Sequence, residues 1–211
     1  MLKKYSLQKI DKFLDVGCGE GFVLKEALKL GFEPYGVDIA DNLDNSVDRD
    51  RVHFFKGNVF AANFRDNYFS AVYIDSVLEH TPDPISTLKE LRRILKPSGL
   101  LLLIVPNEDS LINDVKKFLY TITLNKNKYA RIKPFYSPYH LQGFNKMSLE
   151  FAFKHSGFEI IKLSEFGGSY TFWKSDKRFS KPFIRDLLLY PFGLLSVLMK
   201  RQIQLQGIVR K

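Results

Sequence analysis

The first half of the chain alternates short apolar runs with segments whose apolar residues recur at helical spacing. Helical spacing covers Gly21–Leu30 and Ile85–Leu95, and the polar stretch Asp41–Asp50 fits a brief helix or a turn. The strand-like runs are Lys12–Val16, Pro34–Asp38, Val52–Asn58, Ala71–Ser76 and Gly99–Pro106. Strands that alternate with helices predict βαβ units and a parallel sheet. Within the last run, Leu100–Val105 is continuously apolar, as in a central strand covered on both faces.

Length and composition narrow the class of protein. The chain has 211 residues, with ordinary apolar and charged fractions, so we expect one compact domain over residues 1–211. The single cysteine excludes an internal disulfide and a multi-cysteine metal cluster, and it favours a reducing compartment. The first residues contain no apolar run typical of a signal peptide, so we expect a cytoplasmic protein.

Charge is distributed unevenly along the sequence. Residues 1–115 hold 14 Lys and Arg against 18 Asp and Glu, a net charge of −4, whereas residues 116–211 hold 18 against 5, a net charge of +13. A basic face raises the local concentration of anionic partners. A lysine-rich surface that only keeps the protein in solution is an equally good interpretation.

The most informative motif is Phe-Leu-Asp-Val-Gly-Cys-Gly-Glu-Gly at residues 13–21, where a strand enters a turn. Gly17, Gly19 and Gly21 lack a Cβ, so a ligand can lie against bare backbone there. Asp38 ends the next strand, where a carboxylate can accept hydrogen bonds from two ribose hydroxyls. Together these features predict a site for an adenosine-containing cofactor.

The spacing also indicates which cofactor. A dinucleotide fingerprint would need a third glycine where Phe22 stands, and no Gly-Lys-Ser/Thr loop is present. Asp15 would repel a pyrophosphate but suits the ammonium group of S-adenosylmethionine, which has no phosphate. The D-x-G-x-G-x-G spacing resembles the first motif of class I S-adenosylmethionine-dependent methyltransferases, in particular their small-molecule "type 11/23"-like domains.

The resemblance extends over most of the chain. Further matching segments are Val37–Ile39, Phe55–Val59, Phe69–His80, Leu91–Pro106, His140–Phe144, Met147–Glu150 and Ser156–Ile160. The resemblance implies cofactor contacts from Asp15, Gly17, Cys18, Gly19, Gly21, Asp38, Ile39, Asn58, Val59, Asp75 and Ser76. Asn58 departs from the aspartate common at its position, although its carbonyl oxygen can still accept from the adenine amino group. Cys18 suits a small space-filling role better than that of a nucleophile.

The family resemblance implies a doubly wound, Rossmann-like α/β fold with a seven-stranded sheet. This sheet is mostly parallel, with Glu159–Phe166 and Gln202–Val209 forming an antiparallel edge hairpin. Residues 1–106 would form the cofactor-binding core. Residues 107–139, which begin with a possible helix at Ser110–Leu124, and residues 170–201 would be insertions that shape the acceptor site.

Three residues are candidates for the chemistry at the methyl acceptor. His80 and Glu79 follow the predicted fourth strand, whose carboxyl end should open toward the transferred methyl group. His140 belongs to a segment that borders the pocket in the family. Each could orient or deprotonate an acceptor hydroxyl, but His80 could equally fix the loop that follows it. No spacing of His, Cys, Asp and Glu suggests a bound metal.

The leading functional hypothesis is methyl transfer to oxygen of a small or lipid-linked, anionic acceptor, with S-adenosylhomocysteine as the product. An apolar segment at residues 183–199 lies between basic residues, is too short to cross a bilayer and is interrupted at Pro191–Gly193. It could contact a membrane peripherally, pack on its own domain or meet a second subunit. The oligomeric state is open. The alternatives are an RNA methyltransferase, although no nucleic-acid-binding module is evident, and a non-catalytic protein that keeps the fold.

Overall fold

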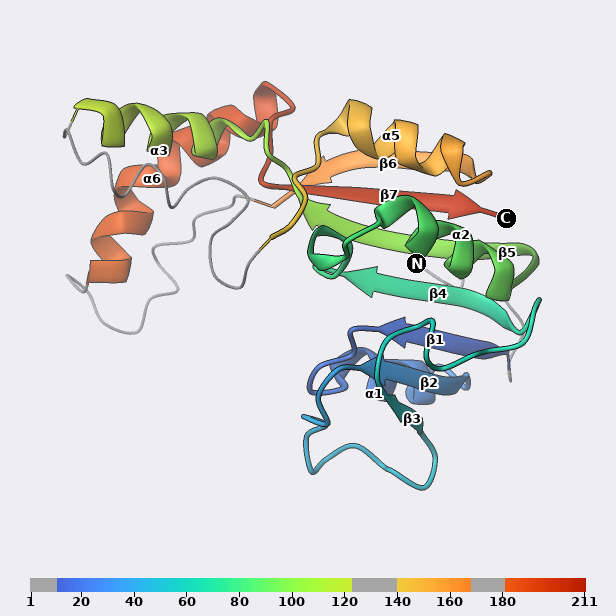
Figure 1. Ribbon diagram of the computed structural model, residues 1–211. Helices are drawn as coiled ribbons and strands as arrows, with labels where there is room; N and C mark the ends of the chain where they lie inside the picture. Colours follow the sequence, from blue (N-terminus) through green and yellow to red (C-terminus); the bar gives the residue numbers. More distant parts are fainter. Residues whose placement is uncertain (1–10, 123–139, 168–180) are drawn as a thin grey trace.

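The computed structural model describes residues 11–122, 140–167 and 181–211. In this part of the chain a single sheet of seven strands has the order β3-β2-β1-β4-β5-β7-β6 (Figure 1). The strands are β1 Lys12–Val16, β2 Glu33–Asp38, β3 His53–Lys56, β4 Phe69–Asp75, β5 Leu95–Pro106, β6 Glu159–Phe166 and β7 Gln204–Arg210. The first five run parallel, and β7 lies antiparallel between β5 and β6. The predicted sheet is therefore confirmed.

Helices cover both faces of the sheet. They are α1 Phe22–Lys29, α2 Pro84–Ile94, α3 Leu111–Ile122, α5 Lys146–His155 and α6 Lys181–Leu198, and a 3-10 turn spans Leu78–His80. In Figure 1, α2 and α5 lie in front of the sheet and α1 lies behind it. This arrangement is doubly wound, as the alternation of strands and helices predicts.

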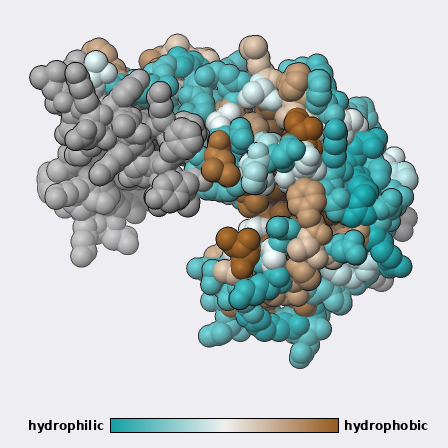
Figure 2. Space-filling model, viewed as in Figure 1, coloured by the Kyte–Doolittle hydropathy of each residue, from teal (hydrophilic) through white to brown (hydrophobic). Residues whose placement is uncertain are grey.

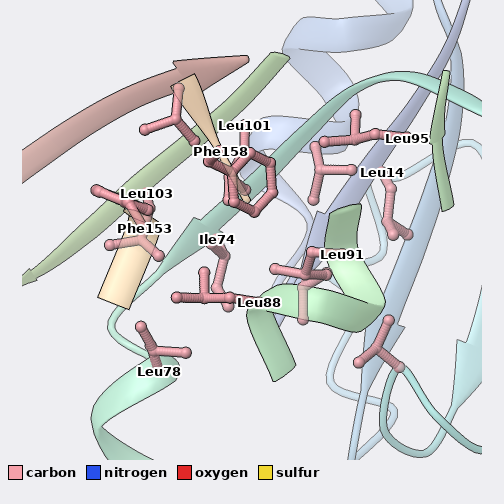
Figure 3. Packing of buried hydrophobic residues seen from close by; sticks show 14 of the residues in the cluster. Leu14, Ile74, Leu78, Leu88, Leu91, Leu95, Leu101, Leu103, Phe153 and Phe158 are labelled. Atoms are coloured by element: carbon pink, nitrogen blue, oxygen red, sulfur yellow. The ribbon is translucent and has the colours of Figure 1, made fainter. Parts of the chain in front are cut away.

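Side-chain alternation along the strands builds a separate core on each face. Leu14 of β1 and Ile74 of β4 pack with Leu88 and Leu91 of α2, in the large cluster drawn in Figure 3. Phe13 of β1 points the other way and packs with residues of α1. Because successive strand side chains point to opposite faces, one strand serves both layers.

Local sequence explains where two of the helices begin. Asp83 accepts a hydrogen bond from the Ser86 amide at 2.9 Å, and Pro84 occupies the first position of α2, where its missing N–H is not needed. Asn145 accepts from the Ser148 amide at 2.9 Å while the Ser148 hydroxyl accepts from the Asn145 amide at 3.0 Å. This reciprocal capping box fixes the start of α5.

Several predicted boundaries differ from the observed ones. Strand β5 begins at Leu95, because Leu95 pairs with Phe69 before the register shifts toward Ala71. In the polar stretch 41–50 the chain makes turns rather than a helix, held in part by the Asp44 carboxylate, which accepts from the Ser46 amide. The helix expected at Ser110–Leu124 is described as Leu111–Ile122, and its last two expected residues belong to residues 123–139, which lie outside the described residues.

Helices α3 and α6 pack against each other beyond the carboxyl ends of the strands (Figure 1). The Arg201 guanidinium donates to the Asp109 carbonyl at 2.9 Å and to the Asp114 carboxylate at 2.5 Å, which ties the end of α6 to the start of α3. The predicted interruption at Pro191–Gly193 is wrong, because α6 continues through Pro191 and changes direction along its length. Helix interiors accept proline by bending. Among the described residues, no helix combines the length and apolar character needed to span a bilayer.

Candidate functional site

The glycine-rich motif forms the turn between β1 and α1. Gly17 donates from its amide to the Val37 carbonyl at 2.7 Å and has a φ of +76°. A Cβ on Gly17 would lie 2.2 Å from Cγ2 of Val77, which follows β4. The absence of a side chain therefore lets the end of β4 close against this turn.

Gly19 presents its backbone to open space. Its φ is +49°, and no heavy atom lies within 4 Å of the position that a Cβ would take. Its amide donates to the Asp38 carboxylate at 2.8 Å, and the Ala40 amide donates to the other oxygen of that carboxylate at 3.0 Å. Backbone and carboxylate thus lie side by side and are both partly exposed, as expected for a cradle that receives a nucleoside.

Three carboxylates from adjacent strands face one another around this turn. Asp15 lies in β1, Asp38 ends β2 and Asp75 ends β4. Burial, with the nearby negative charges of Asp75 and Asp38, raises the pKa of Asp15 to about 7. Because like charges make each ionised carboxylate less stable, this arrangement favours a cationic ligand.

Asp75 is oriented by neighbouring hydroxyl groups. The Tyr73 hydroxyl donates to one of its oxygens at 2.8 Å, and the Ser76 hydroxyl donates to the other at 2.9 Å. Burial and the Asp75 charge raise the pKa of Tyr73, so Tyr73 stays a proton donor. Ser76 itself has a φ of +55°, a conformation that non-glycine residues rarely adopt.

The remaining predicted cofactor residues take different positions. Ile39, after β2, has 80% of its surface exposed, while Val59 is buried in the core. The side-chain oxygen of Asn58, Oδ1, accepts a hydrogen bond from the Ala61 amide at 2.9 Å. One lone pair of this oxygen is therefore already used within the local turn. Cys18 is buried, and burial with the charges of Asp15 and Asp38 raises the pKa of its thiol to about 12. This thiol is not an activated nucleophile.

Gly36 is a contributing residue that the sequence analysis missed. It lies inside β2, and a Cβ there would lie 2.9 Å from both the Cys18 sulfur and Cδ1 of Leu24. The absence of a side chain at Gly36 therefore leaves space for the Cys18 side chain to pack against β2. An isolated glycine within a predicted strand was the available signal, because such a glycine marks close approach of another chain segment.

The fold brings Glu79, His80 and His140 together. One ligand-type atom of each residue lies within 4.8 Å of the others. The His80 and His140 rings meet edge to face with centroids 4.8 Å apart. The amides of Leu141 and Gln142 both donate to the Glu79 carbonyl, at 2.8 and 3.0 Å, which fixes the segment after His140 against the 3-10 turn.

Glu79 is the most unusual member of this cluster. Only 1% of its surface is exposed, and neither carboxylate oxygen has a hydrogen-bond partner among the residues that the structure describes. Burial, and to a lesser extent repulsion by Asp75, raises its pKa, whereas the nearby His80 opposes this shift. Burial together with His80 lowers the pKa of His140, so its imidazole is neutral near pH 7.

The glycine-rich turn and this cluster share the carboxyl edge of the sheet. Figure 2 shows a recess with apolar residues around it, next to the place where β1 and β4 end in Figure 1. The other two histidines lie elsewhere: His53 is in β3 against Glu33, and His155 stacks on Phe151 in α5. A cationic nucleoside that bears an amino acid fits this combination of open glycine backbone and clustered carboxylates.

A doubly wound sheet of this strand order, with an acidic glycine-rich first turn and an acid at the end of β2, defines the class I S-adenosylmethionine-dependent methyltransferases. The family described as a methyltransferase domain matches residues 2–163 of the sequence, and the chain belongs to this family. The protein is therefore an S-adenosylmethionine-dependent methyltransferase.

Related sequences agree with this assignment, and solved structures of methyltransferases share the fold. Demethylmenaquinone methyltransferase from Staphylococcus saprophyticus is 27% identical over 183 residues, which cover 80% of this chain and 78% of the relative. A methyltransferase from Archaeoglobus fulgidus has a similar fold, with a TM-score of 0.66 and 21% identity over 100% of this chain and 91% of that one. Phosphoethanolamine N-methyltransferase 2 from Haemonchus contortus, solved with S-adenosylmethionine, has a TM-score of 0.67 and 18% identity over 100% and 51% of the two chains.

Proposed function

We propose that this methyltransferase transfers a methyl group to an oxygen of a small, lipid-linked and anionic acceptor. The observation that carries this proposal is the cluster of Glu79, His80 and His140 at the end of β4, beside the carboxylates that suit a cationic cofactor. A positioned base next to the methyl donor is what a hydroxyl acceptor needs.

On this proposal the cofactor lies across the carboxyl ends of β1, β2 and β4. Asp38 binds the ribose hydroxyls, while Ile39, Asn58 and Val59 surround the adenine. Gly17, Cys18, Gly19 and Gly21 form the backbone cradle, and Asp15, Asp75 and Ser76 face the amino-acid part. When bound, S-adenosylmethionine supplies a methyl group that is already activated on a cationic sulfonium. Ile39 supports the adenine assignment, because 80% of its surface is exposed and a flat apolar ring would cover it.

His80 is the proposed base that takes the proton of the acceptor hydroxyl. His140 lies against His80 and is neutral near pH 7, so it can share this role. Glu79 lies within 4.8 Å of both histidines and, when ionised, would stabilise the positive charge that His80 gains with the proton. Most of the acceleration would come from holding the acceptor oxygen in line with the methyl group in a water-poor site.

The curated relatives support a lipid-linked acceptor, because their name specifies demethylmenaquinone, a lipid-linked quinone. Loss of a proton from a quinol-type hydroxyl creates negative charge on oxygen and also increases the nucleophilicity of the adjoining ring. The base that we propose would serve methylation at either atom. We favour oxygen, and analysis of the product distinguishes the two.

An exposed apolar patch on α6 supports peripheral contact with a membrane, where a lipid-linked acceptor would reside. We define the α6 patch by the exposed apolar side chains at the end of α6 and directly after it, Phe192, Leu194, Leu195, Val197, Leu198 and Met199. Lys200 follows the patch and is exposed, so it can meet anionic head groups. Arg201 is less suited to that role, because it already binds Asp109 and Asp114. We accordingly propose a cytoplasmic protein that associates with the membrane surface.

Binding and turnover test separate parts of the proposal. Calorimetry should show one equivalent of S-adenosylmethionine bound to the full chain. Asp38→Asn should weaken this binding at least tenfold, whereas Asp50→Asn, at an exposed acid of the same region, should leave it unchanged. Radiolabelled methyl transfer is then measured with a prenylated quinol in detergent or vesicles.

Methyl incorporation into the quinol oxygen, lost in His80→Gln, is the expected result. Cofactor binding without transfer to any lipid-linked quinol would overturn the acceptor assignment and leave the cofactor site intact. Incorporation at a ring carbon would overturn the assignment to oxygen.

A further inference from the structure

The cluster of Glu79, His80 and His140 has the composition of a metal site. A carboxylate and two imidazoles place their ligand-type atoms within 4.8 Å of one another. We propose that these three residues bind one divalent transition-series cation, such as Zn²⁺. The spacing of residues in the sequence does not predict this site, because His140 lies far along the chain from the adjacent pair Glu79 and His80.

The spacing is close to what one cation requires. Nitrogen and oxygen ligands lie about 2.0 to 2.2 Å from Zn²⁺, so atoms that share a tetrahedral ion are separated by roughly 3.5 Å. The widest separation in the cluster is at most 4.8 Å. A contraction of about 1 Å, within the reach of side-chain rotation, would bring all three atoms onto one ion.

The Glu79 carboxylate provides an independent sign of a missing ligand. It is almost completely buried, and within the described part of the chain both of its oxygens lack a hydrogen-bond partner. An unpaired buried carboxylate is costly, and proteins normally pair such a group with a cation or with donors. A cation held between Glu79 and the two imidazoles would satisfy it.

The backbone holds the two ligand-bearing segments in place. The Leu141 and Gln142 amides donate to the Glu79 carbonyl, so the residues next to His140 are bonded directly to the residue that carries the carboxylate. On the other side, the His80 amide donates to the Val77 carbonyl at 2.9 Å, which closes the 3-10 turn. The ligand set therefore needs little reorganisation of the backbone to close on an ion.

The donor types indicate the kind of ion. Imidazole nitrogen suits Zn²⁺, Fe²⁺, Co²⁺ and similar ions, whereas Mg²⁺ and Ca²⁺ prefer sites made of oxygen atoms. Three protein ligands leave at least one coordination position open, which is the pattern of sites that bind a substrate oxygen. If the proposed function holds, the cation would replace His80 as the group that activates the acceptor, because an imidazole that binds a cation no longer accepts a proton. A hydroxyl bound to the cation would release its proton to solvent water more easily, and its anionic oxygen would be held beside the methyl donor.

Metal binding is tested directly, without methyl transfer as the readout. Untagged, chelator-treated protein is titrated with Co²⁺ and followed by visible absorption, and then Zn²⁺ is added as a competitor. The expected result is one equivalent of Co²⁺ with a visible ligand-field band that Zn²⁺ removes. Glu79→Gln and His140→Gln should each weaken Co²⁺ binding at least tenfold.

His155→Gln is the matched control, because it removes one histidine that lies outside the cluster. Circular dichroism and thermal melting confirm that each variant is folded, and His140→Gln keeps the test valid if the change at buried Glu79 prevents folding. Absence of the visible band, or an unchanged affinity in folded His140→Gln, would overturn the metal site. Metal binding without methyl transfer would retain the site and reject the proposed function. Methyl transfer by protein that binds no metal would reject the metal site and retain the proposed function.

Discussion

At the scale of single residues, the site is dominated by carboxylates in surroundings that oppose their charge. Asp15 is nearly buried and faces Asp75 and Asp38 across the strand ends, with the Cys18 thiol and the Tyr73 hydroxyl as the other titratable groups nearby. Such an arrangement stores electrostatic free energy that a cationic ligand can release. Individual residues of this turn lead to three predictions.

The affinity for S-adenosylmethionine should increase as the pH rises toward 7 and then level off. Asp15 has a pKa of about 7 in the ligand-free protein, so below pH 7 it must lose a proton to meet the ammonium group, and binding is weaker there. Calorimetry between pH 5.5 and 8.5 should show this dependence together with proton release. In Asp15→Asn the affinity should be lower at pH 8 and nearly flat with pH; a flat profile for the unsubstituted protein would contradict the prediction.

The same substitution should stabilise the ligand-free protein at high pH. Because the folded-state pKa of Asp15 is raised from 3.8 to about 7, its contribution to the free energy of unfolding falls as the pH rises between these values. The loss is complete above pH 7 and amounts to at most about 4 kcal/mol. Asp15→Asn should therefore unfold at a higher urea concentration than the unsubstituted chain at pH 8, with little difference at pH 4.

Gly17→Ala and Gly19→Ala should separate folding from cofactor binding. An alanine at 17 would meet Val77 at 2.2 Å with φ at +76°, so we expect a loss of about 3 kcal/mol in the free energy of unfolding. An alanine at 19 meets no atom within 4 Å and should cost only about 1 kcal/mol through its positive φ. It should nevertheless weaken cofactor binding at least tenfold. Urea unfolding and calorimetry measure the two effects, and equal stability losses would contradict this distinction.

At the scale of elements, the start of a helix helps to fix the position of a site residue. Helix α5 follows the segment that carries His140, and its start is fixed by the capping box of Asn145 and Ser148. Phe153 and Leu149 of α5 pack in the main core. The His140 segment is therefore held at one end by Glu79 and at the other by the first turn of α5.

Asn145→Ala should lower the free energy of unfolding by about 1 kcal/mol, because it removes the acceptor for the Ser148 amide. Asn145→Asp keeps an acceptor at the same place and should restore most of the loss. Urea unfolding followed by circular dichroism measures both. A full loss in Asn145→Asp would show that the cap is not the cause.

The elements also show what could be predicted from sequence. The strands and the glycine-rich turn follow from local patterns, because apolar runs and positive-φ glycines act within a few residues. The continuity of α6 through Pro191 could not be predicted in this way, because a helix can continue past an interior proline by bending there. Nor could the sequence show that Glu79 is buried or that His140 meets His80, because both depend on hydrogen bonds between segments far apart in the chain.

At the scale of the whole molecule, the first part of the chain is acidic and the second part is basic, which agrees with the different partners that we propose for them. The glycine-rich turn and its carboxylates belong to the part with a net charge of −4, and α6 belongs to the part with a net charge of +13. The exposed apolar side chains of the α6 patch lie on a helix that extends beyond the strand ends (Figure 1). A surface that is both apolar and close to basic residues favours anionic lipid interfaces.

Vesicle binding should depend on both properties. We expect the protein to sediment with vesicles that contain anionic lipid, and less so with neutral vesicles or at high salt, because screening weakens attraction to the head groups. Leu194→Ser combined with Leu198→Ser should reduce the bound fraction severalfold, since these side chains are 54% and 81% exposed. Exchange of exposed Phe151 of α5 for Ser is the matched control. Equal binding by both variants would contradict a role for the α6 patch.

The place of β7 between β5 and β6 has a consequence for synthesis of the protein. As the chain leaves the ribosome, β5 and β6 are both complete while the strand that joins them has not been made. The edges of β5 and β6 that later pair with β7 therefore stay without hydrogen-bond partners until Gln204–Arg210 emerges. A nascent chain of this kind would need shielding from self-association until β7 has emerged, and removal of the β7 segment would leave β6 with no neighbour to join.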